Sequence, residues 1–300
     1  MNNNPSIFSF RGFAASRRPI PLRDLGLAIS VIFAVSGCAS VPMKEAGTLT
    51  SYSNLSAPKG KLSKKRIYVD GQGLAAVKTV SIVPTTYAFG AAPRVKTQAD
   101  RSLVSNALDR ALCVALSDKY QMVPAGQPAD ITIRSVIANV VPTNKITAGI
   151  AAVVTVGGGF AIPGDVPFLS VPRLPIGLGG LAVEAEAVDS GGVQRAAIVW
   201  ARGANAIQDN PRVSEVGDAY GLASKFASDF SGMLVTGEEP KMLDISLPSK
   251  HGVQSWLGGK PKYAACEAFG RAPGVFGAIA ANYGLPPEWT EKKPKPLVTH

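Results

Sequence analysis

The apolar run from Leu25 to Val35 is the feature that most constrains this chain. Four arginines and one aspartate precede the run, and the small residues Ser36 and Gly37 follow it directly. A basic region, a short apolar core and small residues at a cleavage point are typical of a secretory signal peptide. The run is too short to span a bilayer, which needs roughly 20 apolar residues. The sequence therefore predicts an exported protein with residues 1–37 as its leader.

The end of this run adds a lipid anchor to the prediction. Val35-Ser36-Gly37-Cys38 resembles the lipobox of bacterial lipoproteins, which signal peptidase II recognises and cuts just before the cysteine. The resemblance implies a diacylglycerol and an N-acyl chain (palmitate) on Cys38. Ala39 in place of aspartate after the cysteine favours sorting to the outer membrane. An ordinary signal peptide with a chance cysteine is the alternative.

Composition divides the rest of the chain into three parts. Residues 38–60 are rich in serine, proline, glycine and other small residues, which is typical of a flexible tether. The folded domain is expected over residues 61–237. The chain changes character after Gly237, so residues 238–300 are interpreted as a C-terminal extension. Within it, Pro273 is expected to open a short helix, and Phe276 and Trp289 give the extension large side chains to bury.

The net charge limits the classes of partner. It is +10 for the whole chain and +7 without the leader. For an exported chain we expect lipid headgroups, lipopolysaccharide phosphates or cell-wall polymers as anionic partners, and no nucleic acid. Near a lipidated residue, a basic cluster could contact anionic headgroups at about 1 kcal/mol per side chain. A solvated start of the fold is the favoured interpretation of this cluster, which comprises Lys59, Lys61, Lys64, Lys65 and Arg66.

Apolar periodicity predicts the fold class. Thr97 to Asp100 resembles a capping box, and leucine and alanine then recur at helical spacing up to residue 116. A second helix is expected over residues 214–235. Strands are expected over residues 66–69, 77–84, 120–123 and 131–141, with a hairpin over residues 181–202. This order predicts an α+β fold with a mixed or antiparallel sheet and two helices packed on one face.

The hairpin carries two carboxylates on one side of its first strand. If Val188 faces Val193, then Val183 faces Ile198 and the second carboxylate meets Arg195 across the hairpin. Paired carboxylates can perform acid–base chemistry. Cross-strand ion pairing on a solvated face is the commoner role, so we expect no catalysis by these residues, Glu184 and Glu186.

Two cysteines remain when Cys38 is lipidated, an even number for an oxidising compartment. Cys113 falls on the polar side of the first predicted helix, although cysteine prefers burial, so another segment is expected to cover it. If the C-terminal extension does so, Cys266 comes close. A bridge closing so long a loop would stabilise the fold by roughly 4 kcal/mol. Two free buried thiols are the alternative.

Residues 146–162 are uncharged, and glycine and proline interrupt the chain up to residue 180. A buried, glycine-kinked segment over one sheet edge is favoured, because lipid-facing strands should alternate apolar with polar residues. A membrane-inserting or oligomer-forming hairpin is the alternative, which leaves a homo-oligomer open.

Motifs for enzymatic chemistry are absent from the sequence. Neither His251 nor His300 lies near a cysteine or an acidic pair at metal-ligand spacing, so no metal is expected. There is no Gly-x-Ser-x-Gly elbow, and the glycines at 157–159 lack the Gly-Lys-Ser/Thr ending of a phosphate loop. We expect no enzyme activity and no cofactor beyond the acyl chains on Cys38.

Several short motifs occur in a recognisable order. They are the lipobox, Gly47-Thr48-Leu49, Ser51-Tyr52-Ser53-Asn54-Leu55, residues 80–84, the helix to Lys119-Tyr120, residues 137–144, residues 179–189 and Gly217-Asp218-Ala219. Together they resemble the proteobacterial lipoprotein family catalogued as domain of unknown function 3313, over roughly residues 46–234. The resemblance implies an exported outer-membrane protein of a Gram-negative bacterium and brings no accepted activity.

The function expected from these features is that of a lipid-anchored, non-enzymatic interaction or accessory module. It would face the periplasm and bind an envelope protein or polymer. An oligomerising subunit of an envelope export or pore assembly is the alternative, and a cell-wall hydrolase is less favoured.

Overall fold

The computed structural model describes residues 41–149, 177–205, 209–239, 249–292 and 294. One sheet runs through it in the order β1 (Ser63–Val69), β7 (Gln194–Gly203), β6 (Gly180–Asp189), β5 (Ile131–Val141), β2 (Thr79–Ile82) and β4 (Gln121–Val123), and β3 (Thr86–Tyr87) pairs with β5. The first four strands pair antiparallel, whereas β2 runs parallel to both of its neighbours. The predicted mixed sheet is confirmed.

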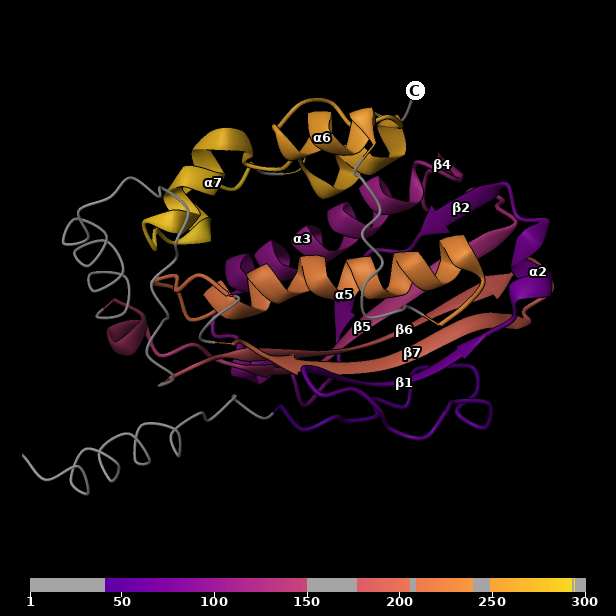
Figure 1. The fold of residues 1–300 in the computed structure, drawn as a ribbon, viewed down its shortest axis with the longest axis horizontal. Coiled ribbons are helices and arrows are strands. Elements are labelled where there is room, and N and C mark those ends of the chain that lie inside the picture. The colour runs from indigo at the N-terminus through magenta and orange to yellow at the C-terminus, as the bar shows by residue number, and fades with distance from the viewer. Residues whose placement is uncertain (1–40, 150–176, 206–208, 240–248, 293, 295–300) are drawn as a thin grey trace, which may run out of the picture. The chain divides into compact units, whose positions relative to one another are not determined.

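Two long helices, α3 (Gln98–Leu116) and α5 (Gly217–Thr236), lie side by side on one face of the sheet (Figure 1). The Thr97 side chain caps α3 by accepting from the Asp100 backbone N–H, as the sequence predicts. Phe226 and Phe230 of α5 stack together, and Trp200 of β7 packs edge-on against Phe226. The α+β class with two helices on one face is therefore confirmed.

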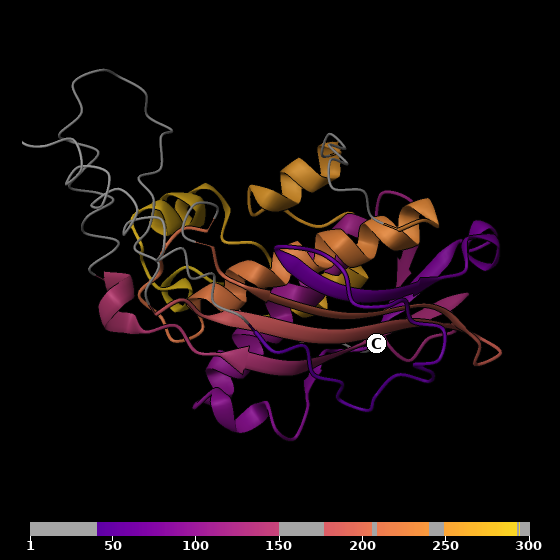
Figure 2. The same ribbon diagram turned by 60° about the horizontal axis from the view of Figure 1, so that its bottom comes forward.

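The C-terminal segment forms a further layer outside α3 and α5. It contains α6 (Lys250–Trp256), η2 (Ala264–Phe269), α7 (Gly274–Asn282) and η3 (Pro287–Trp289). Figure 2 shows α6 and α7 on the helical side of the sheet, opposite the first described residues. We call residues 249–292 the C-terminal layer. Of the remaining short helices, α2 (Gly71–Ala75) connects β1 to β2, and η1 (Ala92–Arg94) lies between β3 and α3.

The opposite face of the sheet is covered by residues 41–57, which we call the N-terminal cover (Figure 2). Val41 packs against alanines of β5, β6 and β7, and Leu49 and Leu55 are buried against β7. This packing differs from the flexible tether expected over residues 38–60. The physical reason is that this second face carries small apolar side chains and buried carboxylates, which need a covering segment.

The β6–β7 hairpin forms in a different register from the predicted one. Val183 pairs with Trp200, two residues from the expected Ile198, because the turn takes up more residues and a bulge follows Ala187. Arg195 consequently contacts Asp189 and Asp70 rather than the second carboxylate.

Among the residues that the structure describes, no helix is both long and apolar enough to cross a membrane. The predicted leader, its lipobox and residues 150–176 of the glycine-rich stretch lie outside the described residues.

Candidate functional site

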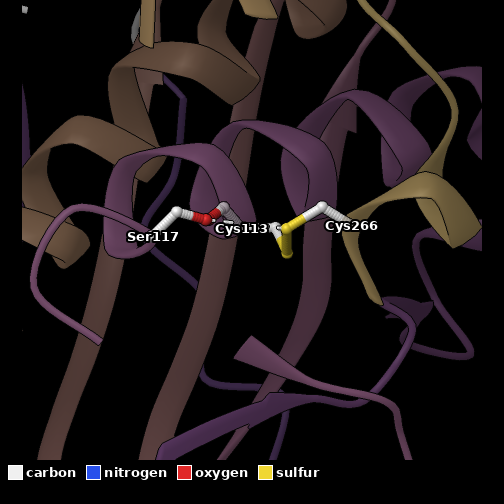
Figure 3. The surroundings of a disulfide bond; sticks show 3 residues. All are labelled: Cys113, Ser117 and Cys266. Carbon is white, nitrogen blue, oxygen red and sulfur yellow. Dashed lines mark hydrogen bonds between the residues drawn. A yellow bond between two sulfur atoms is a disulfide. The ribbon is translucent and has the colours of Figure 1, made fainter. Parts of the chain in front are cut away.

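The two cysteines predicted as an even pair are joined in a disulfide. Cys113 comes from α3 and Cys266 from η2, and both are buried (Figure 3). The Ser117 hydroxyl lies beside the bridge, donating to the Cys113 carbonyl at 2.6 Å. The C-terminal layer thus supplies the cover that Cys113 needs on the polar side of α3.

Charged contacts reinforce the attachment of the C-terminal layer. Arg110 of α3 forms an ion pair with Glu291, and the Tyr220 hydroxyl donates to the same carboxylate at 2.6 Å. Burial raises the pKa of Tyr220, with the Glu291 charge adding to the effect. Lys262 donates to the Ser117 carbonyl at 2.8 Å. These contacts come from residues far apart along the layer, so they hold it at several points.

Glu184 lies on the sheet face covered by the N-terminal cover and is 0% exposed. Its carboxylate accepts from the Ala46 backbone N–H at 2.6 Å and from the hydroxyls of Thr48 and Tyr52, each at 2.8 Å. Burial of the Tyr52 hydroxyl raises its pKa, and the hydrogen bond to Glu184 is the second cause of the rise. A buried carboxylate is tolerated where such donors replace water.

Glu186 is held in the same way two residues further along β6. It accepts from the Thr50 backbone N–H at 2.7 Å, from the Thr50 hydroxyl at 3.0 Å and from the Gln194 amide at 2.9 Å. Arg134 approaches at 3.8 Å. The expectation of a solvated face was therefore wrong, because the N-terminal cover excludes water and supplies uncharged donors; the cross-strand ion pair is made with Arg134 of β5 and not with Arg195. Hydroxyl residues recur at every second position in the cover (Thr48, Thr50 and Tyr52), with the same spacing as the two glutamates of β6. This shared spacing is the signal that the sequence analysis missed.

The predicted basic cluster lies on edge strand β1 and in the loop before it. Three of its members pair with carboxylates of the protein: Lys59 with Glu239, Lys65 with Asp229 and Arg66 with Glu45. Lys61 and Lys64 are exposed. Exposed lysines on an edge strand also discourage pairing with other chains. Contact of the cluster with anionic headgroups stays a prediction.

The glycine-rich stretch is described only at its two ends. The Asn144 backbone N–H donates to the Gly177 carbonyl at 2.9 Å, so both ends leave the core at one point. The question of a buried, membrane-inserting or oligomer-forming segment concerns residues 150–176, which are not described.

Exposed apolar side chains gather in the C-terminal layer. Of the fourteen large apolar side chains exposed among the described residues, nine belong to this layer. Phe276 is 67% exposed and Trp289 is 72% exposed, so the expectation that they are buried was wrong. Small residues, Gly274, Gly277 and Ala280, form the buried side of α7 instead. The C-terminal apolar surface, as we call it, comprises Val253, Trp256, Leu257, Val275, Phe276, Ile279, Tyr283, Leu285 and Trp289.

One small, open hollow lies at the start of α5. Its lining includes two acidic residues, Asp209 and Asp218, and one basic residue, Arg212. The Arg212 guanidinium stacks 5.1 Å from the Tyr220 ring centre, and burial lowers its pKa. Within the described part of the chain, no three histidine, cysteine or acidic side chains are grouped as a metal site would require.

Two solved structures resemble the chain weakly. The PelC dodecamer from Paraburkholderia phytofirmans is 11% identical with a TM-score of 0.35, covering 60% of this chain and 100% of PelC. A substituted PelC dodecamer from the same organism is 11% identical with a TM-score of 0.33, covering 59% and 96%. We draw no conclusion about this chain from similarity at that level. None of the curated proteins compared with the chain matches it significantly.

A family model gives a clear match. The model described as a protein of unknown function (DUF3313) matches residues 44–230. The match begins in the N-terminal cover, includes the whole sheet and most of α5, and ends before the C-terminal layer. The chain therefore belongs to the DUF3313 family of proteins of unknown function.

Proposed function

We propose that this chain is a lipid-anchored protein of the outer membrane that faces the periplasm and acts there as a non-enzymatic interaction module. The anchor would be the acyl chains on Cys38. The proposal rests on the leader and lipobox of the sequence together with the place where the folded chain begins.

The position of Val41 is the observation that carries the proposal. Val41 is buried, and a Cβ on Gly180 would lie only 2.0 Å from its side chain, so the two segments approach very closely. Consecutive Cα atoms are about 3.8 Å apart, so Cys38 lies no more than about 11 Å from Val41. A lipid on Cys38 would therefore hold the sheet and its helices directly at the bilayer surface.

The hydrogen bonds that the two buried glutamates accept from the protein support a non-enzymatic role. Every oxygen of Glu184 and Glu186 accepts at least one hydrogen bond from the protein. A general acid or base must reach the proton that it transfers in a bound substrate. These carboxylates instead fasten the N-terminal cover to the sheet.

Lipidation and localisation test the proposal directly. The full-length protein would be expressed in a Gram-negative host fed a palmitate analogue, and the membranes would be fractionated. We expect label in the outer-membrane fraction, and no label or processing for Cys38→Ser. Ser36→Ala keeps a small residue before the cleavage point and serves as the matched control, which should remain labelled. Label retained by Cys38→Ser, or wild-type protein free in the periplasm, would contradict the anchor.

Crosslinking in intact cells, followed by purification from solubilised envelopes, tests the interaction role. A discrete stoichiometric partner, lost with Cys38→Ser, would support an accessory module. A ladder of the protein alone would support the oligomerising subunit of an export or pore assembly instead. Turnover of cell-wall material by the purified protein would favour a hydrolase and contradict the non-enzymatic role.

A further inference from the structure

We infer that the C-terminal apolar surface docks onto an anionic phospholipid bilayer, so that the protein contacts the membrane through this surface in addition to Cys38. The inference rests on the proposed lipid anchor, because the anchor keeps a bilayer within reach.

The side chains of this surface are those that favour a membrane interface. Helix α7 contains no charged residue, and Val275, Phe276, Ile279 and Tyr283 occupy one face of about 100° at helical spacing. Tryptophan and tyrosine prefer the headgroup level, where an apolar ring meets water. Trp289 follows α7 in η3, and Trp256 ends α6, which contacts α7.

Basic residues flank the apolar side chains. Lys250, Lys260 and Lys292 are exposed in the C-terminal layer against one exposed acid, Glu288, whereas Glu267 and Glu291 are paired with Arg271 and Arg110. Lysines beside an apolar surface attract anionic headgroups. A two-fold dimer through the same surface would place six lysines around one interface against two exposed glutamates, an excess of like charge that disfavours a second copy as the occupant.

The α7 part of this surface also lies toward the end of the sheet where the described residues begin. The Val213 backbone N–H donates to the Gly284 carbonyl just after α7, at 2.9 Å, and Asn210 binds Asn282. Both contacts fall in the loop between β7 and α5. Val41 packs on Gly180, which pairs with Gly203 at the end of β7. Figure 1 shows α7 and the start of the described chain toward the same end of the sheet.

The contacts that attach the C-terminal layer leave the apolar surface unused. The disulfide, the Arg110–Glu291 pair and the Lys262 hydrogen bond all involve other side chains. Nine large exposed apolar side chains in one segment exceed the single ones normally scattered on a protein surface, and such a concentration marks an interaction site.

Vesicle binding by the non-acylated protein tests the inference. The mature chain, residues 38–300 with Cys38→Ser, would be mixed with phosphatidylethanolamine vesicles containing phosphatidylglycerol, and with phosphatidylcholine vesicles. We expect sedimentation with the anionic vesicles and at least tenfold weaker binding to the neutral ones. Trp256 and Trp289 should shift to shorter emission wavelength and be quenched by brominated lipid. Trp200 is 0% exposed and should report only that the core is folded.

Substitutions distinguish vesicle binding through this surface from nonspecific binding through other exposed apolar side chains. Phe276→Ser with Trp289→Ser should weaken binding to anionic vesicles at least tenfold. Phe89→Ser with Val193→Ser removes two exposed apolar side chains outside the C-terminal layer and should leave binding unchanged. Intact secondary structure and an oxidised Cys113–Cys266 bond would be verified for both variants.

Several results would overturn the inference without touching the proposed anchor. One is that the non-acylated chain binds no vesicle, although the full-length protein is lipidated on Cys38 in cells. Another is equal binding to neutral vesicles, or equal binding by the Phe276→Ser, Trp289→Ser variant. Self-association that this variant abolishes, in the absence of lipid, would assign the surface to a second copy. If vesicles bind but Cys38 carries no lipid, the anchor fails and the docking surface stands.

Discussion

The N-terminal cover and the C-terminal layer both pack against the same core, on its opposite faces, yet they are built in opposite ways. The N-terminal cover buries its apolar side chains and satisfies two buried carboxylates with hydroxyl and backbone donors. The C-terminal layer is fastened by one disulfide and a few charged contacts, and it leaves large apolar side chains exposed.

The difference distinguishes a segment that the fold requires from a segment that presents an exposed apolar surface. The N-terminal cover lies almost wholly within the family match, and the C-terminal layer lies outside it. The first segment completes a sheet face that would otherwise expose buried carboxylates. The second covers Cys113 and presents the C-terminal apolar surface, which is where we place recognition.

Removing the disulfide should have the largest effect on the comparison. For Cys113→Ser with Cys266→Ser we expect the free energy of unfolding to fall by about 4 kcal/mol, because the two cysteines that the bridge joins are 153 residues apart in the sequence. Urea denaturation checks the magnitude, and hydrogen exchange should show the C-terminal layer opening before the N-terminal cover. Simultaneous opening of both segments would show that they are not independent.

Glu184→Ala should destabilise the opposite face by about 3 kcal/mol, because the Ala46, Thr48 and Tyr52 donors lose a buried acceptor. Limited proteolysis should then cut within the N-terminal cover while the C-terminal layer stays intact. Tyr52→Phe removes one donor and serves as the matched control, with an expected loss of about 1 kcal/mol. Equal losses for the two variants would argue against a shared acceptor.

A third buried carboxylate sharpens the comparison through pH. Asp109 of α3 accepts hydrogen bonds from the backbone N–H and the hydroxyl of Thr85, and burial raises its pKa to about 7. The folded protein thus holds a proton up to about pH 7 that the unfolded chain releases near pH 4, so stability falls as the pH rises through this window. We expect the protein to be about 1 kcal/mol more stable at pH 6 than at pH 8. Thermal denaturation of Asp109→Asn should lack this slope, and an unchanged slope would exclude Asp109 as its source.

Substitutions in the C-terminal apolar surface should have the smallest effect on stability. Phe276→Ser and Trp289→Ser remove exposed side chains, so we expect the free energy of unfolding to change by less than about 0.5 kcal/mol. Leu55→Ala in the N-terminal cover is the contrasting control, with an expected loss of about 2 kcal/mol. A comparable loss for Trp289→Ser would mean that this surface stabilises the fold.

Elements with strong local signals could be predicted. The Thr97 cap and the apolar stripe after it define α3, and Gly237 ends α5 in the left-handed conformation that favours glycine. The hairpin over residues 181–202 was predicted, but its register was wrong because a bulge shifts the pairing and does not change the alternation of side chains. The mismatch between Cys113 and the polar face around it predicted a covering segment, and the structure confirms the bridge to Cys266.

The sequence by itself determined the family and the mixed α+β core, and it predicted that a segment carrying Cys266 covers Cys113, whereas the export signal stays a prediction. Each of these depends on neighbouring residues, on a short motif or on a count. Only the tertiary structure decided that Glu184 and Glu186 are buried beneath the N-terminal cover, and that Phe276 and Trp289 are exposed. A side chain is buried when a segment distant in the sequence packs over it. The spacing of residues along one strand or helix does not indicate which segment that is.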